Sequence, residues 1–376
     1  MFCDKWVSPL DPLNSKARRG VKRLLIEDSS ATDAIPFYVS QFRFYRAPVN
    51  DLAIGLLSAL LATNPPAAVS NLIQKKTGLA VAVANPNDPV EREFKKLMAE
   101  DDAAHEQVDD WIQESYKDEQ KKVSLRARIE QRLDSIRKAY EKFLIAHPDH
   151  AKALLAYGSF LNDQGEEEAA EKQWNKALAA DPKEPAAWNN LANFYGHNGN
   201  AAKAIEYYGK AITLDPEEST YYHNLATTVF VFRRDATNYF KLSEAEVFDK
   251  SLDLYRKAIA LDPTNFFLVS DYAQSYYALK PQRFDDSAKN KEAEQKLVDD
   301  ALSAWRMAYK IAPGNREQQG VVIHFARWEI NGARYGQARK TLDSITNETL
   351  QAARSTLLKR LDRQTQGKGT NAPATP

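Results

Sequence analysis

The sequence predicts an all-α fold, a solenoid of helical hairpins preceded by a helical N-terminal region. Two observations carry this prediction. Fourteen glycines in 376 residues is about half the usual share, while helix-forming Ala, Leu, Lys and Glu are abundant. Similar sequence segments recur along the chain, and each ends in a proline. Successive prolines of this set are 34, 34, 47 and 50 residues apart, at Pro148, Pro182, Pro216, Pro263 and Pro313. A period of this length is typical of stacked helix pairs.

The first fifty residues show little periodicity and give no functional prediction. The apolar run at 52–62 has two interpretations, and both stay open. It is too short for a membrane span, which needs about 20 residues. It is either a buried helix of a cytoplasmic protein or the core of a signal peptide within residues 43–70. In the second case the protein is periplasmic or secreted, and the segment before the signal is not native sequence.

Residues 51–116 are predicted to form a helical N-terminal region. Asp88, Pro89 and Glu91 mark a helix start, because Asp caps, Pro suits the first turn and Glu occupies the capping-box position. The helix is expected to continue to about Tyr116. Its apolar residues recur on one face, which predicts packing against another helix. A further helix over 124–147 fits the second half of a leading repeat unit at 117–150.

Each repeat unit is predicted to be a helical hairpin. The turns contain Gly165 and Gly199, which tolerate positive φ. Small residues recur in phase where two helices must approach closely, with Trp or Tyr beside them. These small residues are Gly158, Ala192, Ala226 and Ala273.

The 34-residue repeat unit resembles the tetratricopeptide repeat. The resemblance covers about residues 120–345, and residues 185–218 match almost throughout. The resemblance implies a right-handed α-α superhelix. The array is expected to span 117–347, with a capping helix at 348–363 and a disordered tail at 364–376. Its units lie near 117–150, 151–184, 185–218, 219–265, 266–315 and 316–347.

The units at 219–265 and 266–315 each contain an insertion at the hairpin turn. The first is rich in aromatic residues, and Ser243 and Glu246 form a capping box that restarts its helix. We expect it to pack as a helix on its own or the following hairpin. The second insertion, around 280–296, is mostly charged and is expected to be a solvated flap beside the first. Together the two insertions are expected to form a wall along one side of the concave groove of the repeat array.

Composition and motifs narrow the class of protein. Fifty-one basic residues balance 51 acidic ones, which disfavours nucleic acid as the main partner. Cys3 is the single cysteine, so it supports neither an intramolecular disulfide nor a thiolate zinc site. No nucleophile-elbow, zinc-protease, dinucleotide or phosphate-loop spacing is present in a suitable context. His147 and His150 flank Pro148 and are expected to be solvated turn residues. The sequence therefore predicts no enzyme, cofactor, metal or membrane span.

The resemblance also implies that the first helices of successive hairpins line a concave groove. The groove positions in this sequence, which we name the polar row, are Asn189, Asn190, Asn193, His197, His223, Asn224, Thr227, Asp271, Gln274 and Tyr277. Asn190, Asn224 and Asp271 occupy the same position of three units. They are similar to the asparagine ladder by which some arrays hold an extended peptide backbone.

The predicted function is a non-catalytic protein-protein interaction scaffold that binds an extended peptide or partner protein in this groove. The alternative is an accessory subunit of an enzyme or envelope complex, with catalysis on another chain. A chaperone-tail clamp is not expected, because Leu155, Ser159 and Thr220 stand at positions where the family's clamp has other residues. Replacing Asn190 and Asn224 with Ala is expected to weaken partner binding by about 1–3 kcal/mol and to leave stability nearly unchanged.

Overall fold

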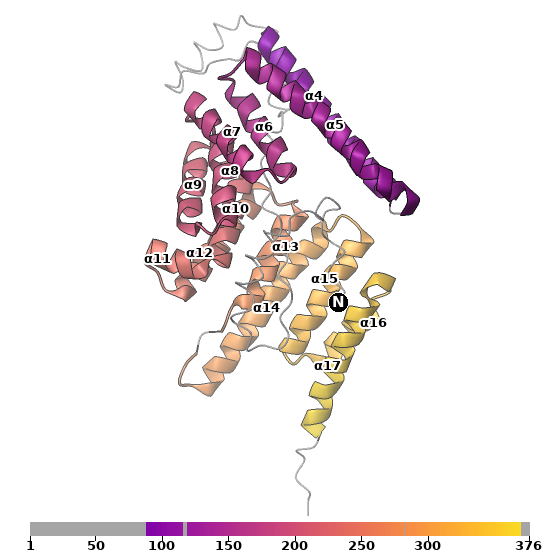
Figure 1. Cartoon of the computed structure of the whole chain (residues 1–376). Helices are drawn as coiled ribbons and strands as arrows, with labels where there is room; N and C mark the ends of the chain where they lie inside the picture. The colour runs from indigo at the N-terminus through magenta and orange to yellow at the C-terminus, as the bar shows by residue number, and fades with distance from the viewer. Residues whose placement is uncertain (1–87, 116–118, 282, 370–376) are drawn as a thin grey trace, which may run out of the picture. The chain divides into compact units, whose positions relative to one another are not determined.

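The computed structural model describes residues 88–115, 119–281 and 283–369, and the described residues are helices joined by short turns (Figure 1). They fall into two compact units, 88–197 and 198–369. The fold is all-α, as the sequence predicts. The predictions for residues 1–50, for the apolar run at 52–62 and for a signal peptide lie outside the described residues. None of the described helices is both long and apolar enough to cross a membrane.

The described residues of the first unit form five helices, of which the first packs on the second, and the third and fourth form a repeat hairpin. They are α4 (Pro89–Ser115), α5 (Glu119–Ala146), α6 (Ala151–Asp163), α7 (Glu167–Ala180) and α8 (Pro185–His197). The start of α4 is where the sequence predicts it, since Val90 N donates to Asp88 Oδ1 at 2.9 Å. The apolar face of α4 packs on α5, where the buried Tyr140 hydroxyl donates to Asp101 Oδ2 at 2.7 Å.

The expectation for His150 was wrong. His150 is the N-cap of α6, and its Nδ1 accepts a hydrogen bond from Ala153 N at 3.1 Å. Its Nε2 lies 3.4 Å from Glu91 Oε1, and its ring packs 4.8 Å from that of Phe94. Burial lowers the pKa of His150 despite the nearby carboxylate. A turn that joins two packed hairpins is covered by its neighbours, which the local sequence does not reveal.

The close approach within the first hairpin follows the predicted pattern. Gly158 on α6 faces the indole of Trp174 on α7, which is fully buried and donates to Leu155 O at 3.3 Å. A Cβ added at Gly158 would overlap that indole. The turn glycines Gly165 and Gly199 both have φ of 78°, which glycine adopts at no steric cost.

The second unit continues the pattern of paired helices and ends with a closing helix. Its elements are α9 (Ala201–Leu214), α10 (Ser219–Val231), α11 (Arg233–Phe240), α12 (Glu244–Leu261), α13 (Phe266–Ser275), η1 (Tyr276–Ala278), α14 (Ser287–Ile311), α15 (Asn315–Asn331), α16 (Tyr335–Asp343), η2 (Glu348–Leu350) and α17 (Gln351–Gly369). Helices α10 and α12, α13 and α14, and α15 and α16 pack as hairpins.

The first insertion forms α11, which packs on α10 and α12 of its own hairpin and also on the preceding α9. Its buried Ala236 allows the close approach, and Phe230 and Phe248 pack with ring centroids 5.7 Å apart. The capping box is present at the start of α12, with Ser243 N donating to Glu246 Oε2 at 2.8 Å. Helix α12 therefore begins where the sequence predicts.

The second insertion, around 280–296, is mostly exposed, as expected of a solvated segment, and from Ser287 onward it is helical. It lengthens the N-terminal half of α14, and this half is tied to the turn between α15 and α16. Arg334 donates to Asp299 Oδ1 at 2.7 Å, and Gln295 Nε2 donates to Gly332 O at 3.3 Å. The ion pair with the next hairpin involves Asp299, beyond the insertion, whereas Arg283 and Lys296 of the insertion pair with Glu294 and Asp300. The two insertions pack on different helices, and the wall they were expected to form remains a prediction.

Helix α17 packs on α15 and α16 and closes the second unit. Leu357 and Leu361 are buried in a cluster with Ile323, Ile330 and Leu342. The helix continues to Gly369, so the predicted start of a disordered tail at 364 was too early. Each residue added to a helix already formed gains a backbone hydrogen bond, which favours extension beyond the last buried turn.

Candidate functional site

In the first unit, a chain of buried polar side chains joins two successive first helices, α6 and α8. Ser159 Oγ donates to Leu155 O at 3.2 Å, and Asn190 Nδ2 donates to Ser159 Oγ at 3.1 Å. Asn189 Nδ2 in turn donates to Asn190 Oδ1 at 3.2 Å. The carboxamide of Asn190 is therefore oriented from both ends. Ser159 belongs to this chain although the sequence-based reasoning did not select it as a site residue.

Burial along α8 differs from the expectation of an open polar row. Asn189, Asn190 and Asn193 are fully buried, whereas His197 at the C-terminal end of the helix is exposed. A buried amide is costly unless it is hydrogen-bonded, which accounts for the bonds between these side chains.

In the second unit, polar-row residues of α10 and α13 meet directly. His223 Nε2 and Asp271 Oδ2 lie 2.9 Å apart, with 13% of each side chain exposed. Thr227 Oγ1 lies 2.9 Å from the Tyr255 hydroxyl, and Asn224 is buried nearby on α10. Gln274 on α13 is half-buried. Successive first helices are thus joined side by side through the predicted positions in this unit as well.

The row extends into α15 through residues that the sequence-based reasoning missed. The Tyr277 hydroxyl lies 2.9 Å from His324 Nδ1, and the Tyr277 ring stacks on Trp328. The His324 ring stacks on Trp305 with centroids 3.8 Å apart. The signal was available, because His324 precedes Ala326 by two residues, as Asn190 precedes Ala192 and Asn224 precedes Ala226.

Burial shifts the pKa values of Tyr277 and His324. It raises the pKa of Tyr277, and it holds the pKa of His324 well below its usual value, with the charge of Arg327 acting in the same direction. His324 is therefore neutral at pH 7, and the imidazole has one donor and one acceptor nitrogen. The hydrogen bond to Tyr277 uses one of them.

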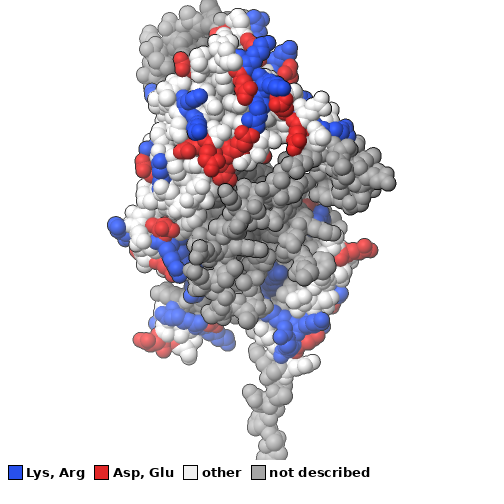
Figure 2. All heavy atoms as spheres, viewed as in Figure 1, with Lys and Arg blue, Asp and Glu red and all other residues white. Residues whose placement is uncertain are grey.

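The chemistry of the row is that of hydrogen-bonding polar groups. His223 and Asp271 are bonded to each other, and the amides carry no charge. Figure 2 shows Lys and Arg side chains interspersed with Asp and Glu side chains over the described part of the face in view. Among the described residues, no group of three His, Cys, Asp or Glu side chains is placed to hold a metal ion. The arrangement is suited to hydrogen bonding with a neutral ligand.

Comparison with known proteins identifies the repeat. Residues 151–194 and 185–218 each match a model of the tetratricopeptide repeat. No curated protein matches the chain in sequence.

Three of the solved structures that match part of the chain are the following. MamA is 20% identical, with 50% of this chain and 92% of that chain covered and a TM-score of 0.36. YrrB, described as a TPR protein with an unusual peptide-binding site, is 15% identical, with 59% and 99% covered and a TM-score of 0.41. The pilF protein of Pseudomonas aeruginosa is 18% identical, with 68% and 99% covered and a TM-score of 0.41.

Proposed function

We propose that this tetratricopeptide-repeat protein, which is a protein-interaction scaffold, binds an extended peptide segment of its partner along the polar row. The observation that supports the proposal is the side-to-side bonding of polar residues from successive first helices. Ser159 bonds to Asn190 in the first unit, and His223 pairs with Asp271 in the second. In this proposal the protein has no catalytic role and needs no cofactor.

The bonding matters because it fixes the orientation of groups that a peptide would meet. Ordering a free polar side chain on binding costs about 0.5–1.5 kcal/mol. His223 and Tyr277, which are partly exposed, are already held by intramolecular bonds, so little of this cost remains for them. Amides and neutral imidazole both donate and accept, as a peptide backbone does. The proposed ligand is therefore recognised mainly through its backbone.

Gln274 offers the clearest test of the proposal. It is half-buried on α13, and the structure gives its side chain no hydrogen bond with a described residue. Gln274→Ala should therefore change ligand contact more than folding. Gln131→Ala, an exposed position on α5, is the matched control.

The experiment selects peptides on the full chain from a displayed random library and measures their binding by calorimetry. Gln274→Ala should weaken binding by about 0.5–1.5 kcal/mol with little change in thermal unfolding, and Gln131→Ala should bind as wild type. Methylating single backbone nitrogens of the selected peptide should weaken binding more than replacing its side chains with Ala. Binding that Gln274→Ala leaves unchanged and that depends only on peptide side chains would contradict the proposal.

Asn190→Ala is a less suitable variant than the sequence suggests. Asn190 is fully buried and bonded to Ser159 and Asn189. Removing its carboxamide leaves buried polar groups without a partner, which costs about 1–3 kcal/mol of stability. The expectation of nearly unchanged stability therefore does not hold for this residue.

A further inference from the structure

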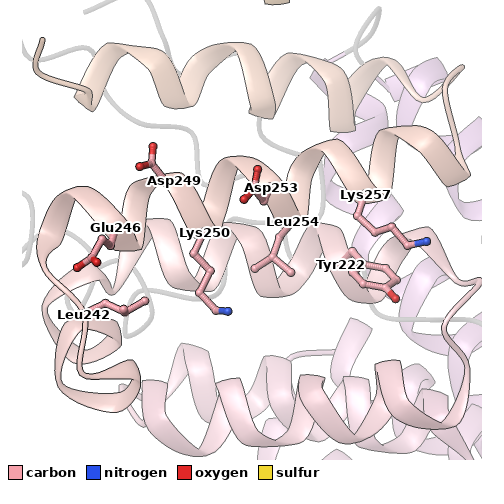
Figure 3. Close-up of a pocket in the computed structure, with 8 residues that line it drawn as sticks. All are labelled: Tyr222, Leu242, Glu246, Asp249, Lys250, Asp253, Leu254 and Lys257. Carbon is pink, nitrogen blue, oxygen red and sulfur yellow. The ribbon is translucent and has the colours of Figure 1, made fainter. Parts of the chain in front are cut away.

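A pocket of about 460 Å³ lies along α12, and none of its lining residues belongs to the polar row (Figure 3). It is lined by Tyr222, Leu242, Glu246, Asp249, Lys250, Asp253, Leu254 and Lys257. Leu242 comes from the segment between α11 and α12, so the first insertion supplies one end of the pocket. A repeat unit without this insertion would lack that wall.

The pocket combines an apolar surface with two lysines. Tyr222, Leu242 and Leu254 are all partly buried. Lys250 Nζ lies 4.5 Å from the centroid of the Phe240 ring, and Lys257 Nζ lies 5.8 Å from that of Tyr222. Such cation-π contacts at exposed sites are worth about 0.5–1 kcal/mol. The lysines therefore stand over aromatic rings beside the apolar surface.

The lysines and the leucine form one face of α12. Lys250, Leu254 and Lys257 are separated by four and three residues, the spacing that places side chains on the same side of a helix. Figure 3 shows Lys250 and Leu254 projecting to the same side of α12, with Asp249 and Asp253 on the other side. The basic groups and Leu254 thus face a ligand together.

Three carboxylates line the pocket, and two of them are hydrogen-bonded, while the third, Asp249, projects to the other side of α12 from Lys250 and Leu254 (Figure 3). Glu246 accepts from Ser243 N and Ser243 Oγ at 2.8 and 2.7 Å, and Asp253 accepts from Arg256 at 2.6 Å. For Lys250 and Lys257, the described part of the chain provides ring contacts and no ion pair. An acidic ligand would therefore meet two ammonium groups that form no ion pair with the carboxylates of the pocket.

We propose that this pocket binds an amphipathic helix of a partner protein that carries an acidic residue, an apolar residue and a second acidic residue on one face. Two α-helices side by side share the same rise, so a seven-residue spacing spans about 10.5 Å on both. A ligand with Glu at position i, Leu at i+4 and Glu at i+7 places its carboxylates opposite Lys250 and Lys257 and its leucine against Leu254. Helix-in-groove binding of this kind depends on such anchors.

The test uses a fluorescein-labelled 15-residue peptide with Glu, Leu and Glu at this spacing in an otherwise neutral Ala and Gln sequence. Anisotropy titrations compare the full wild-type chain with the double variant Lys250→Glu, Lys257→Glu. The matched control is Lys296→Glu with Lys310→Glu on α14, which makes the same change in net charge at exposed positions. The variant should bind about tenfold more weakly or worse, and the control should bind within about twofold of wild type.

A complementary exchange makes the test specific. A peptide with Lys in place of both glutamates should bind the double Glu variant better than it binds wild type, and replacing the peptide leucine with Ser should weaken binding to wild type. If the double Glu variant is poorly folded by circular dichroism, Lys250→Gln with Lys257→Gln replaces it. Absence of saturable binding to wild type, equal losses in pocket and control variants, or binding indifferent to the leucine would each overturn the proposal.

Discussion

Gly158→Ala is a sensitive test of how the repeat hairpin packs. A methyl group added at Gly158 would lie 2.5 Å from Trp174 Cδ1 and closer still to Nε1, in a region where the indole is fully buried. An indole in a buried site has few alternative rotamers. The added methyl must therefore push α6 and α7 apart or displace Trp174 from its hydrogen bond to Leu155 O.

The expected cost is the balance of three effects. Overpacking a well-packed interface costs about 1–3 kcal/mol. Losing the indole hydrogen bond costs about 0.5–1.5 kcal/mol. Replacing Gly by Ala within a helix stabilises the helix by about 1 kcal/mol. The net result is a loss of about 0.5–3.5 kcal/mol in the free energy of unfolding.

Gly209→Ala is the matched control, because a Cβ added at Gly209 on α9 meets no atom within 4 Å. It should stabilise the protein by about 0.5–1 kcal/mol through helix propensity alone. Equilibrium unfolding in urea, followed by circular dichroism and by tryptophan fluorescence, measures both changes. The two variants should shift the midpoint in opposite directions. A Gly158→Ala protein as stable as wild type would refute the packing argument.

Three further predictions concern capping and pH. Ser243→Ala, which removes the N-cap of α12, should cost about 0.5–2 kcal/mol in urea unfolding, and no change would show that the cap is dispensable. Burial lowers the pKa of His324 below 6.5, the ordinary value of a histidine. The free energy of unfolding of the wild type should therefore fall by up to about 1.4 kcal/mol per pH unit as the pH falls below 6.5. His324→Phe should flatten this slope, and equal slopes would contradict the assignment. Burial raises the pKa of Glu329 above 4.5, so its contribution to stability is lost as pH rises through the folded-state pKa. Glu329→Gln should therefore raise the unfolding temperature at about pH 8 and have little effect near pH 4.

The hairpins could be predicted because their signals are local and repeated. Proline after each second helix and a small residue opposite an aromatic one recur every 34 residues in the regular units. The contact between Gly158 and Trp174 is the physical counterpart of that pattern. The start of α12 could be predicted for the same reason, since Ser243 and Glu246 lie within one helical turn.

Contacts between hairpins could not be predicted in this way. Asp299 pairs with Arg334, 35 residues further along the chain. His223 and Asp271 are separated by 48 residues. A sequence pattern assigns each of these residues to a face of its own helix, but the partner depends on how consecutive hairpins stack.

The last repeat unit, 316–347, departs from the repeat pattern, and its contact with the preceding unit could not be predicted from the sequence. Its terminal proline is missing, and the predicted polar row stopped at Tyr277. The small residue that sets the register, Ala326, is nevertheless fully buried, so α15 keeps the orientation of the other first helices relative to its partner α16. That orientation brings His324 to Tyr277. Because burial keeps His324 neutral, the row can lengthen without adding a buried charge, and a peptide bound along it would meet the same kind of hydrogen-bonding group in α15 as in α10.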